Sequence, residues 1–162
     1  MVLTATMNEP IKPINPIERP DRQPFQARSA SVEAQKAIYK AIKEAGINVW
    51  DGTNRKPSYP FVKLGEELTS GSTISKDSTG RNLNLTLHIW SDFPDTAEVK
   101  SLGDFLIERL VYSPLYLENG FCVGNRSLDH VRYTEASNGM NKGSRGYLFL
   151  DFQVIDSWNS PI

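Results

Sequence analysis

Cysteine and histidine are scarce in this chain of 162 residues, which holds one cysteine and two histidines. Because Cys122 has no second cysteine to pair with, an internal disulfide and a disulfide-stapled secreted scaffold are excluded. His88 and His130 stand 42 residues apart, and no His-x-x-x-His or Cys-x-x-Cys spacing accompanies them. We therefore expect neither a metal site nor any other cofactor.

The chain also lacks an excess of charge of either sign. It has 18 Lys and Arg against 19 Asp and Glu, with a pI near 6.1, so no global electrostatic attraction draws it to nucleic acid. No run of about 18 apolar residues predicts a membrane span, and the apolar start at residues 1–6 is too short for a signal peptide. Since 39% of the residues are hydrophobic, we expect a soluble protein with a real core that folds in a reducing cytoplasm.

Catalytic motifs are missing as well. The sequence has no G-x-x-x-x-G-K-[ST] loop, no G-x-G-x-x-G and no G-x-S-x-G elbow. Cys122 and His130, which follows Asp129, could act as nucleophile and base, and the protein would then be a small thiol enzyme. Cys122 stands between Phe121 and Val123, where a small apolar side chain suits a strand, and this interpretation is favoured. We therefore predict that the protein is not an enzyme.

Proline is distributed unevenly and divides the chain into an arm and a domain. Five of the ten prolines fall within the first 24 residues, at a spacing that excludes a helix and removes backbone donors from a sheet. Large apolar side chains, which a plain linker would lack, accompany them. These residues are Pro10, Pro13, Pro16, Pro20, Pro24, Ile11, Ile14, Ile17 and Phe25. We predict an extended arm at residues 1–30 that orders on a partner or a neighbouring copy, with a disordered tail as the alternative, then a domain at residues 31–158 and a short tail at residues 159–162.

Two segments have the periodicity of amphipathic helices. The first spans residues 31–45, and the second starts near residue 95 and ends before Pro114. Their apolar stripes are Ala34, Ala37, Ile38, Ala41, Ile42 and Ala45 in the first, and Val99, Leu102, Leu106 and Leu110 in the second. The residues expected to cap them are Ser29 or Ser31, Gly46, and Asp95 with Glu98 as a capping box.

Six shorter segments have the composition or alternation of strands. They are residues 47–51, 59–65, 82–91, 121–123, 127–136 and 145–155. Residues 66–80 are rich in Ser, Thr and Gly, lack a core pattern, and are expected to form a long, mobile loop. The order of elements predicts an α+β fold in which two helices pack on one face of an antiparallel sheet.

Aromatic residues fall on the less aliphatic side of the clearest strands, where they alternate with leucines. Partly exposed aromatic rings on a sheet are typical of an interface. The candidate assembly residues are Trp90, Phe93, Tyr147 and Phe149. The alternative is that the first helix, Trp50 or Trp158 covers that side within one copy.

Basic residues in the last third of the chain are assigned to a solvated sheet face. They are Arg126, Arg132, Lys142 and Arg145. No known nucleic-acid motif with interleaved aromatic residues surrounds them, so a nucleic-acid site is the less favoured interpretation.

The order of motifs along the chain is similar to that of a known family. After the first helix come V-W-D-G at residues 49–52, P-F-V-K-L-G-E at residues 60–66 and L-H-I-W-S at residues 87–91. A second helix and two long closing strands follow. Over about residues 32–156 the chain resembles the tail-completion proteins of long-tailed bacteriophages, the tail-to-head joining or tail-terminator group.

The resemblance implies a structural virion protein with no chemistry of its own. Copies would form a hexameric ring at the head-proximal end of the tail, where the ring ends the tail tube and joins it to the head–tail connector or neck. DNA would pass through the channel without sequence-specific binding, and assembly would take place in the host cytoplasm without a membrane. A head-completion adaptor of the neck is the alternative within the same class.

The resemblance also gives the polar stretch at residues 66–80 a role. We expect it to point into the channel or onto the docking face, where its few charges let DNA slide past. The residues concerned are Ser70, Ser72, Lys76 and Asp77.

Overall fold

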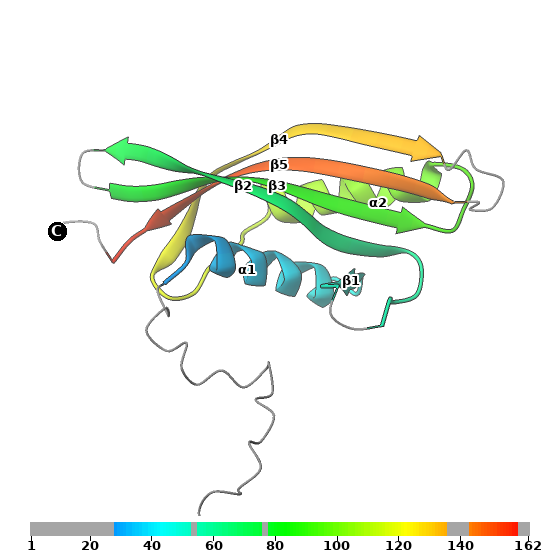
Figure 1. The fold of residues 1–162 in the computed structure, drawn as a ribbon, viewed down its shortest axis with the longest axis horizontal. Helices are drawn as coiled ribbons and strands as arrows, with labels where there is room; N and C mark the ends of the chain where they lie inside the picture. The colour runs from blue at the N-terminus through cyan, green and yellow to red at the C-terminus, as the bar shows by residue number, and fades with distance from the viewer. Residues whose placement is uncertain (1–27, 53–54, 76–77, 136–142, 159–162) are drawn as a thin grey trace, which may run out of the picture.

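Two helices lie against one face of a five-stranded sheet, so the expected α+β fold is confirmed (Figure 1). The computed structural model describes residues 28–52, 55–75, 78–135 and 143–158. The elements are α1 (Ala30–Glu44), β1 (Asn48–Trp50), β2 (Phe61–Ser75), β3 (Ser78–Ser91), α2 (Ala97–Ile107), the π-helical turn η2 (Glu108–Tyr112), β4 (Phe121–Glu135) and β5 (Ser144–Asp156). Most of the predicted arm and the tail at residues 159–162 lie outside the described residues.

The sheet has the strand order β1-β2-β3-β5-β4 and is mixed. β1 runs parallel to β2, and each of the other neighbouring pairs is antiparallel. The expectation of a purely antiparallel sheet is therefore wrong at this edge. The first residue of β2 lies beside the first residue of β1, in the pair Asn48↔Phe61, so both strands run in the same direction.

The core lies between the helices and the leucine side of the two central strands. Alternate residues of β3 and β5 are buried there, as the period-two pattern predicts. The main contributors are Leu83, Leu87 and Ile89 of β3, Leu148, Leu150, Phe152 and Val154 of β5, Ala34, Ile38 and Ile42 of α1, and Val99, Leu106 and Leu110 of α2 and η2. Because both helices join this single cluster, the opposite face of the sheet carries no helix from the described part of the chain.

The polar stretch at residues 66–80 forms a hairpin, so the predicted loop is wrong. β2 continues to Ser75 and β3 begins at Ser78, with pairs such as Thr69↔Leu83 along the way. In β3, Thr79 pairs with Asp156 of β5 as well. Ladder hydrogen bonds and the β-propensity of threonine hold these residues extended without a hydrophobic stripe. Ser70 and Ser72 are thus strand residues, whereas Lys76 and Asp77 lie outside the described residues.

One long strand, β4, replaces the two strands expected at residues 121–123 and 127–136. Register shifts between Val123 and Arg126 and between Leu128 and His130 let the strand bulge and still pair with β5. The bulges break the alternation, which is why the sequence pattern suggested an interruption. Cys122 lies in this strand between Phe121 and Val123, and its side chain is exposed.

The caps of α1 follow the sequence prediction. Ser29 Oγ accepts a hydrogen bond of 3.2 Å from the backbone N–H of Val32, which confirms Ser29 rather than Ser31 as the N-cap. Gly46 follows the helix with φ of 81°, the left-handed conformation that glycine adopts most easily.

The start of α2 differs from the prediction. Thr96 is the N-cap residue and makes no side-chain capping bond, while Asp95 Oδ1 accepts from the N–H of Ala97 at 2.9 Å. Glu98 does not complete a capping box, because its carboxylate accepts from Ser91 Oγ at 2.6 Å. This bond ties the start of α2 to the end of β3.

Candidate assembly surfaces

The face of the sheet that points away from the helices carries aromatic and basic side chains. We call it the open face and define it by Lys63, His88, Trp90, His130, Arg132, Arg145, Tyr147 and Phe149. Strand pairing sets them in rows across the sheet, and one row runs Lys63↔His88↔Tyr147↔Arg132. Since side chains alternate between the faces of a strand, these residues share one side.

Three of the four predicted interface residues meet on the open face. Trp90, Tyr147 and Phe149 are half-buried there, whereas Phe93 lies in the connection between β3 and α2 and is 54% exposed. Trp90 belongs to β3 and the other two rings belong to β5, so the pairing of these strands brings together residues that are far apart in the sequence.

Neither helix covers the open face. α1 packs on the opposite, leucine-rich side, and Trp158 lies beside Arg28 at the other end of the molecule. Trp50 lies at the edge of this face, where its ring centroid is 6.0 Å from that of Phe61, and Phe61 in turn stacks on Trp90 with ring centroids 5.9 Å apart. Within the described residues, Trp50 covers the β2 edge of this side, whereas α1 and Trp158 do not cover it.

The cations of the open face lie over aromatic rings. The Arg145 guanidinium is 3.7 Å from the ring centroid of Trp90, and the Arg132 guanidinium is 4.6 Å from that of Tyr147. The Lys63 ammonium is 5.1 Å from the Trp50 centroid. Contacts of this kind contribute about 0.5–1 kcal/mol at exposed sites, so the rings hold the cations in place.

No carboxylate of the described residues forms an ion pair with Lys63, Arg132 or Arg145. The ion pair within the patch joins His88 Nε2 to Glu66 Oε2 at 3.3 Å. A hydrogen bond from its own backbone N–H, and then the bond with His88, hold the pKa of Glu66 below its ordinary value of 4.5. The charge of Lys63 lowers the pKa of Glu66 further, so within this part of the chain Arg132 and Arg145 are the cations of the open face that have no nearby carboxylate partner.

Toward the tip of the β2–β3 hairpin the open face becomes polar. Asn84 Nδ2 donates to Asp151 Oδ1, and both lie in a shallow cleft of about 370 Å³ with Ser70 and Ser127. The predicted docking residue Ser70 is therefore continuous with the polar end of this surface.

A second surface, on the outer side of α2, was missed by the sequence analysis. Phe105 is 48% exposed, Tyr112 69% and Tyr116 83%, although the periodicity placed Phe105 beside the buried stripe. Residues 92–118 carry six carboxylates against two cations, a net charge of −4. Phe105 and Tyr112 are seven positions apart, and this helical repeat of aromatic residues is the feature that could have revealed the surface.

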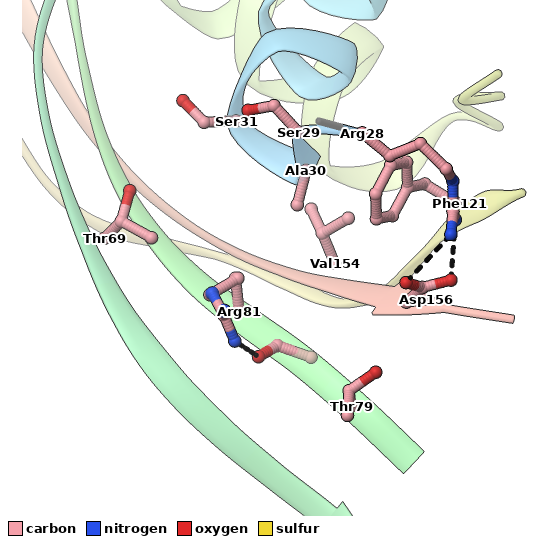
Figure 2. Close-up of a pocket in the computed structure, with 11 residues that line it drawn as sticks. Arg28, Ser29, Ala30, Ser31, Thr69, Thr79, Arg81, Phe121, Val154 and Asp156 are labelled. Atoms are coloured by element: carbon pink, nitrogen blue, oxygen red, sulfur yellow. Dashed lines mark hydrogen bonds and ion pairs between the residues drawn. The ribbon is translucent and has the colours of Figure 1, made fainter. Parts of the chain in front are cut away.

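The junction between the arm and the domain was also missed. The Arg28 guanidinium donates to Asp156 Oδ1 at 2.7 Å and Oδ2 at 3.2 Å (Figure 2). Its Nε also donates to the carbonyl of Asn119 at 3.0 Å. It also lies 4.6 Å from the ring centroid of Phe121 and 4.1 Å from that of Trp158. Arg28 and Asp156 are 128 residues apart, so no local pattern could pair them.

A cleft of about 550 Å³ opens beside this junction, between the start of α1 and the hairpin (Figure 2). Hydroxyl groups from Ser29, Ser31, Thr69 and Thr79 line it. Ser31 Oγ donates to Glu67 Oε1 at 2.5 Å and ties α1 to β2. Ala30, Phe121 and Val154 also line the cleft, so its lining is both polar and apolar.

The basic residues of the last third do not all share one face. Arg132 and Arg145 lie on the open face, but Arg126 Nη1 donates to the carbonyls of Leu110 and Ser113, each at 2.7 Å. Partial burial, and then the charge of Arg109, lower the pKa of Arg126 from its ordinary value. Arg126 holds the end of η2, so its assignment to a solvated face is wrong, and Lys142 lies outside the described residues.

The structure separates Cys122 from His130. Their partners on β5, Ile155 and Phe149, are six positions apart, which corresponds to about 20 Å along a strand. His130 Nδ1 instead bonds Asp129 at 2.9 Å. Among the described residues no group of three or more His, Cys, Asp or Glu could hold a metal ion, and no helix is long and apolar enough to cross a bilayer.

The uncovered open face indicates the class of protein. An aromatic sheet face that no helix covers is typical of a protein that assembles with other chains.

Comparison with known proteins specifies the class. The model of the family described as tail completion protein gp17 matches residues 27–149, and the chain belongs to that family. A chain in the virion of a native gene transfer agent particle is similar, with a TM-score of 0.65, 18% identity, and coverage of 80% of this chain and 99% of that one. The gp17 protein of bacteriophage SPP1 is also similar, with a TM-score of 0.47, 20% identity, and coverage of 76% and 89%. No curated protein sequence matches.

The resemblance stated from the sequence motifs is therefore confirmed at the level of the family. The protein is therefore a tail-completion protein with a structural role. The likeness to the gene transfer agent chain shows the fold, and it covers nearly all of that chain.

Proposed function

We propose that copies of this chain assemble head to tail into a ring of six subunits that ends the tail tube and joins the tail to the head. The observation that carries the proposal is the family match over residues 27–149. The ring would lie at the head-proximal end of the tail, between the tail tube protein and the connector or neck protein, after assembly in the host cytoplasm. Trp90, Phe93, Tyr147 and Phe149 would lie in contacts between subunits.

Two sheet edges support ring formation. β1 pairs with β2 only at residues 61–63, so the outer side of β2 beyond Lys63 has no neighbouring strand among the described residues. β4 is the other edge of the sheet. Unpaired backbone groups at such edges can pair with another chain. Two different patches on each subunit give a head-to-tail contact, which forms a closed ring when its rotation divides a full turn.

The hairpin of β2 and β3 is the proposed docking or channel element. Its polar strands include Ser70 and Ser72, and Lys76 and Asp77, which stand between the two strands in the sequence, add one charge of each sign. A surface with little net charge would let DNA pass without strong phosphate binding.

The test removes the protein from virions and then restores it. Without it, we expect tail tubes of irregular length that do not join heads, and the wild-type chain should restore both properties. Native mass and negative-stain images of the purified protein or of isolated tails should show a six-fold ring. Tubes of uniform length attached to heads in its absence would refute the proposal.

A second assay separates tail completion from head completion. Purified protein is mixed with heads alone and with tails alone, and the product is then tested for joining. Tails that become competent support the proposal, whereas heads that become competent would assign the protein to the neck as a head-completion adaptor.

A further inference from the structure

We propose that the open face of one subunit binds the outer side of α2 of the next subunit. The proposal rests on the ring described above and names the two surfaces that meet in it. In this contact, the open face of one subunit lies against the solvent-facing side of α2 in the neighbouring subunit.

Charge complementarity is the first argument. Arg132 and Arg145 have no carboxylate within ion-pair distance among the described residues, and the rings of Tyr147 and Trp90 hold them in place. Residues 92–118, which include α2, carry a net charge of −4, and none of their carboxylates forms an ion pair in the described part of the chain. Each surface therefore lacks the charge that the other offers, which favours one docking orientation.

The spacing of the charges is the second argument. Asp104 and Glu108 are one helical turn apart, which places them about 6 Å from each other. Arg132 of β4 pairs with Tyr147 of β5, and Arg145 stands two positions before Tyr147 in β5. The Cα atoms of the two arginines are therefore about 8 Å apart. The spacing of the two arginines is close to that of the two carboxylates, and the flexible arginine side chains can make up the difference. Each arginine can then bind one carboxylate.

The aromatic content of both surfaces is the third argument. Half-buried Tyr147 and Phe149 lie among the cations, and exposed Phe105 and Tyr112 lie among the carboxylates. Aromatic residues and arginine are enriched in the centres of protein interfaces. Docking would bury apolar area that one copy leaves in water.

The geometry of the fold makes this contact a ring contact. α2 packs on the leucine face of the sheet and the open face is on the other side, so the two surfaces of one copy point in different directions (Figure 1). They cannot bind each other within a subunit. A contact between unlike surfaces on opposite sides propagates from copy to copy until it closes.

The experiment reverses the charge of each surface separately. One variant carries Arg132→Glu and Arg145→Glu, and the other carries Asp104→Lys and Glu108→Lys. Each alone should reduce the fraction of protein in rings at least tenfold, measured by native mass spectrometry, because like charges would then face each other. A control with Lys40→Glu and Lys43→Glu, at exposed positions of α1, should form rings as the wild type does.

Mixing the two charge-reversed variants gives the decisive result. When the two variants alternate around a ring, each contact joins either two charge-reversed surfaces or two native surfaces. Both combinations bring opposite charges together. Equal amounts of the two variants should therefore restore rings in which both alternate. Rings from either variant alone, or no rings from the mixture while both remain folded by circular dichroism, would refute the proposal.

Cross-linking in isolated tails tests the contact where the ring is assembled. Thr134 pairs with Arg145 and so belongs to the open face, and Glu108 lies on the outer side of α2. In a Cys122→Ser background, Thr134→Cys together with Glu108→Cys should give disulfide-linked oligomers up to the full ring. Tails that join heads normally but show no cross-link would leave the tail-completion function standing and overturn this contact.

Discussion

Gly103 of α2 faces Tyr133 of β4, and this contact sets how closely the helix approaches the sheet. A Cβ at position 103 would lie 2.2 Å from Tyr133 Oη and 3.1 Å from Cζ. In a solvated helix, Gly→Ala stabilises by about 1 kcal/mol. Here the added methyl forces Tyr133 or the helix to move, and overpacking of this kind costs about 1–3 kcal/mol. We therefore expect Gly103→Ala to lower the free energy of unfolding by up to about 2 kcal/mol.

A double-mutant cycle separates the clash from the helix propensity. Tyr133→Phe removes the oxygen that lies closest, so Gly103→Ala should cost less, or stabilise, in that background, with a coupling of about 1 kcal/mol. Ser101→Ala, at an exposed position of the same helix, should stabilise by a few tenths of a kcal/mol. Urea unfolding measures all of these free energies. If Gly103→Ala stabilises equally in the wild-type chain and in the Tyr133→Phe variant, the argument for a close approach is wrong.

Three further changes probe the junctions of the fold. Arg28→Ala should destabilise by about 1–2 kcal/mol in urea, because it removes the paired bonds to Asp156 at the root of the arm; an unchanged midpoint would contradict this. Arg126→Met should cost about 1–3 kcal/mol and speed amide exchange at residues 110–115, since it frees the carbonyls at the end of η2; unchanged exchange would refute it. His88→Gln should raise the pKa of Glu66 part of the way toward 4.5 in a carboxyl NMR titration, because the bond to its own backbone N–H remains. The folded-state pKa of Glu66 is lowered, so its pair with His88 stabilises the fold above pH about 4.5 and is lost as the pH falls through the lowered pKa; an unchanged pKa in the variant would show that His88 plays no part.

Local pattern predicted the parts of the fold that depend on near neighbours. The apolar stripe of residues 31–45 predicted α1, and the alternation around Leu85 and Leu150 predicted which face of β3 and β5 is buried. The same alternation placed Trp90 and Tyr147 together on the other face. These inferences succeed because helical and strand periods are properties of a short stretch of chain.

Pairing between distant segments could not be predicted in the same way. The hairpin at residues 66–80 has no apolar pattern, so only its partners in β3 and β5 make it a strand. The parallel pairing of β1 depends on the path of residues 51–60, and Arg126 was placed on a solvated face because its carbonyl partners belong to η2 and the residue after it. Every residue type except proline offers the same backbone N–H and C=O groups, so the sequence does not show which distant backbone groups will pair.

The sequence by itself therefore determined the α+β class, the family and the aromatic content of the candidate interface. The tertiary structure decided that the open face is basic, that the outer side of α2 is acidic and aromatic, and that Arg28 closes on Asp156. The physical reason is that charge and exposure at a surface are sums over several strands and helices, and only the packed fold brings those residues to one side.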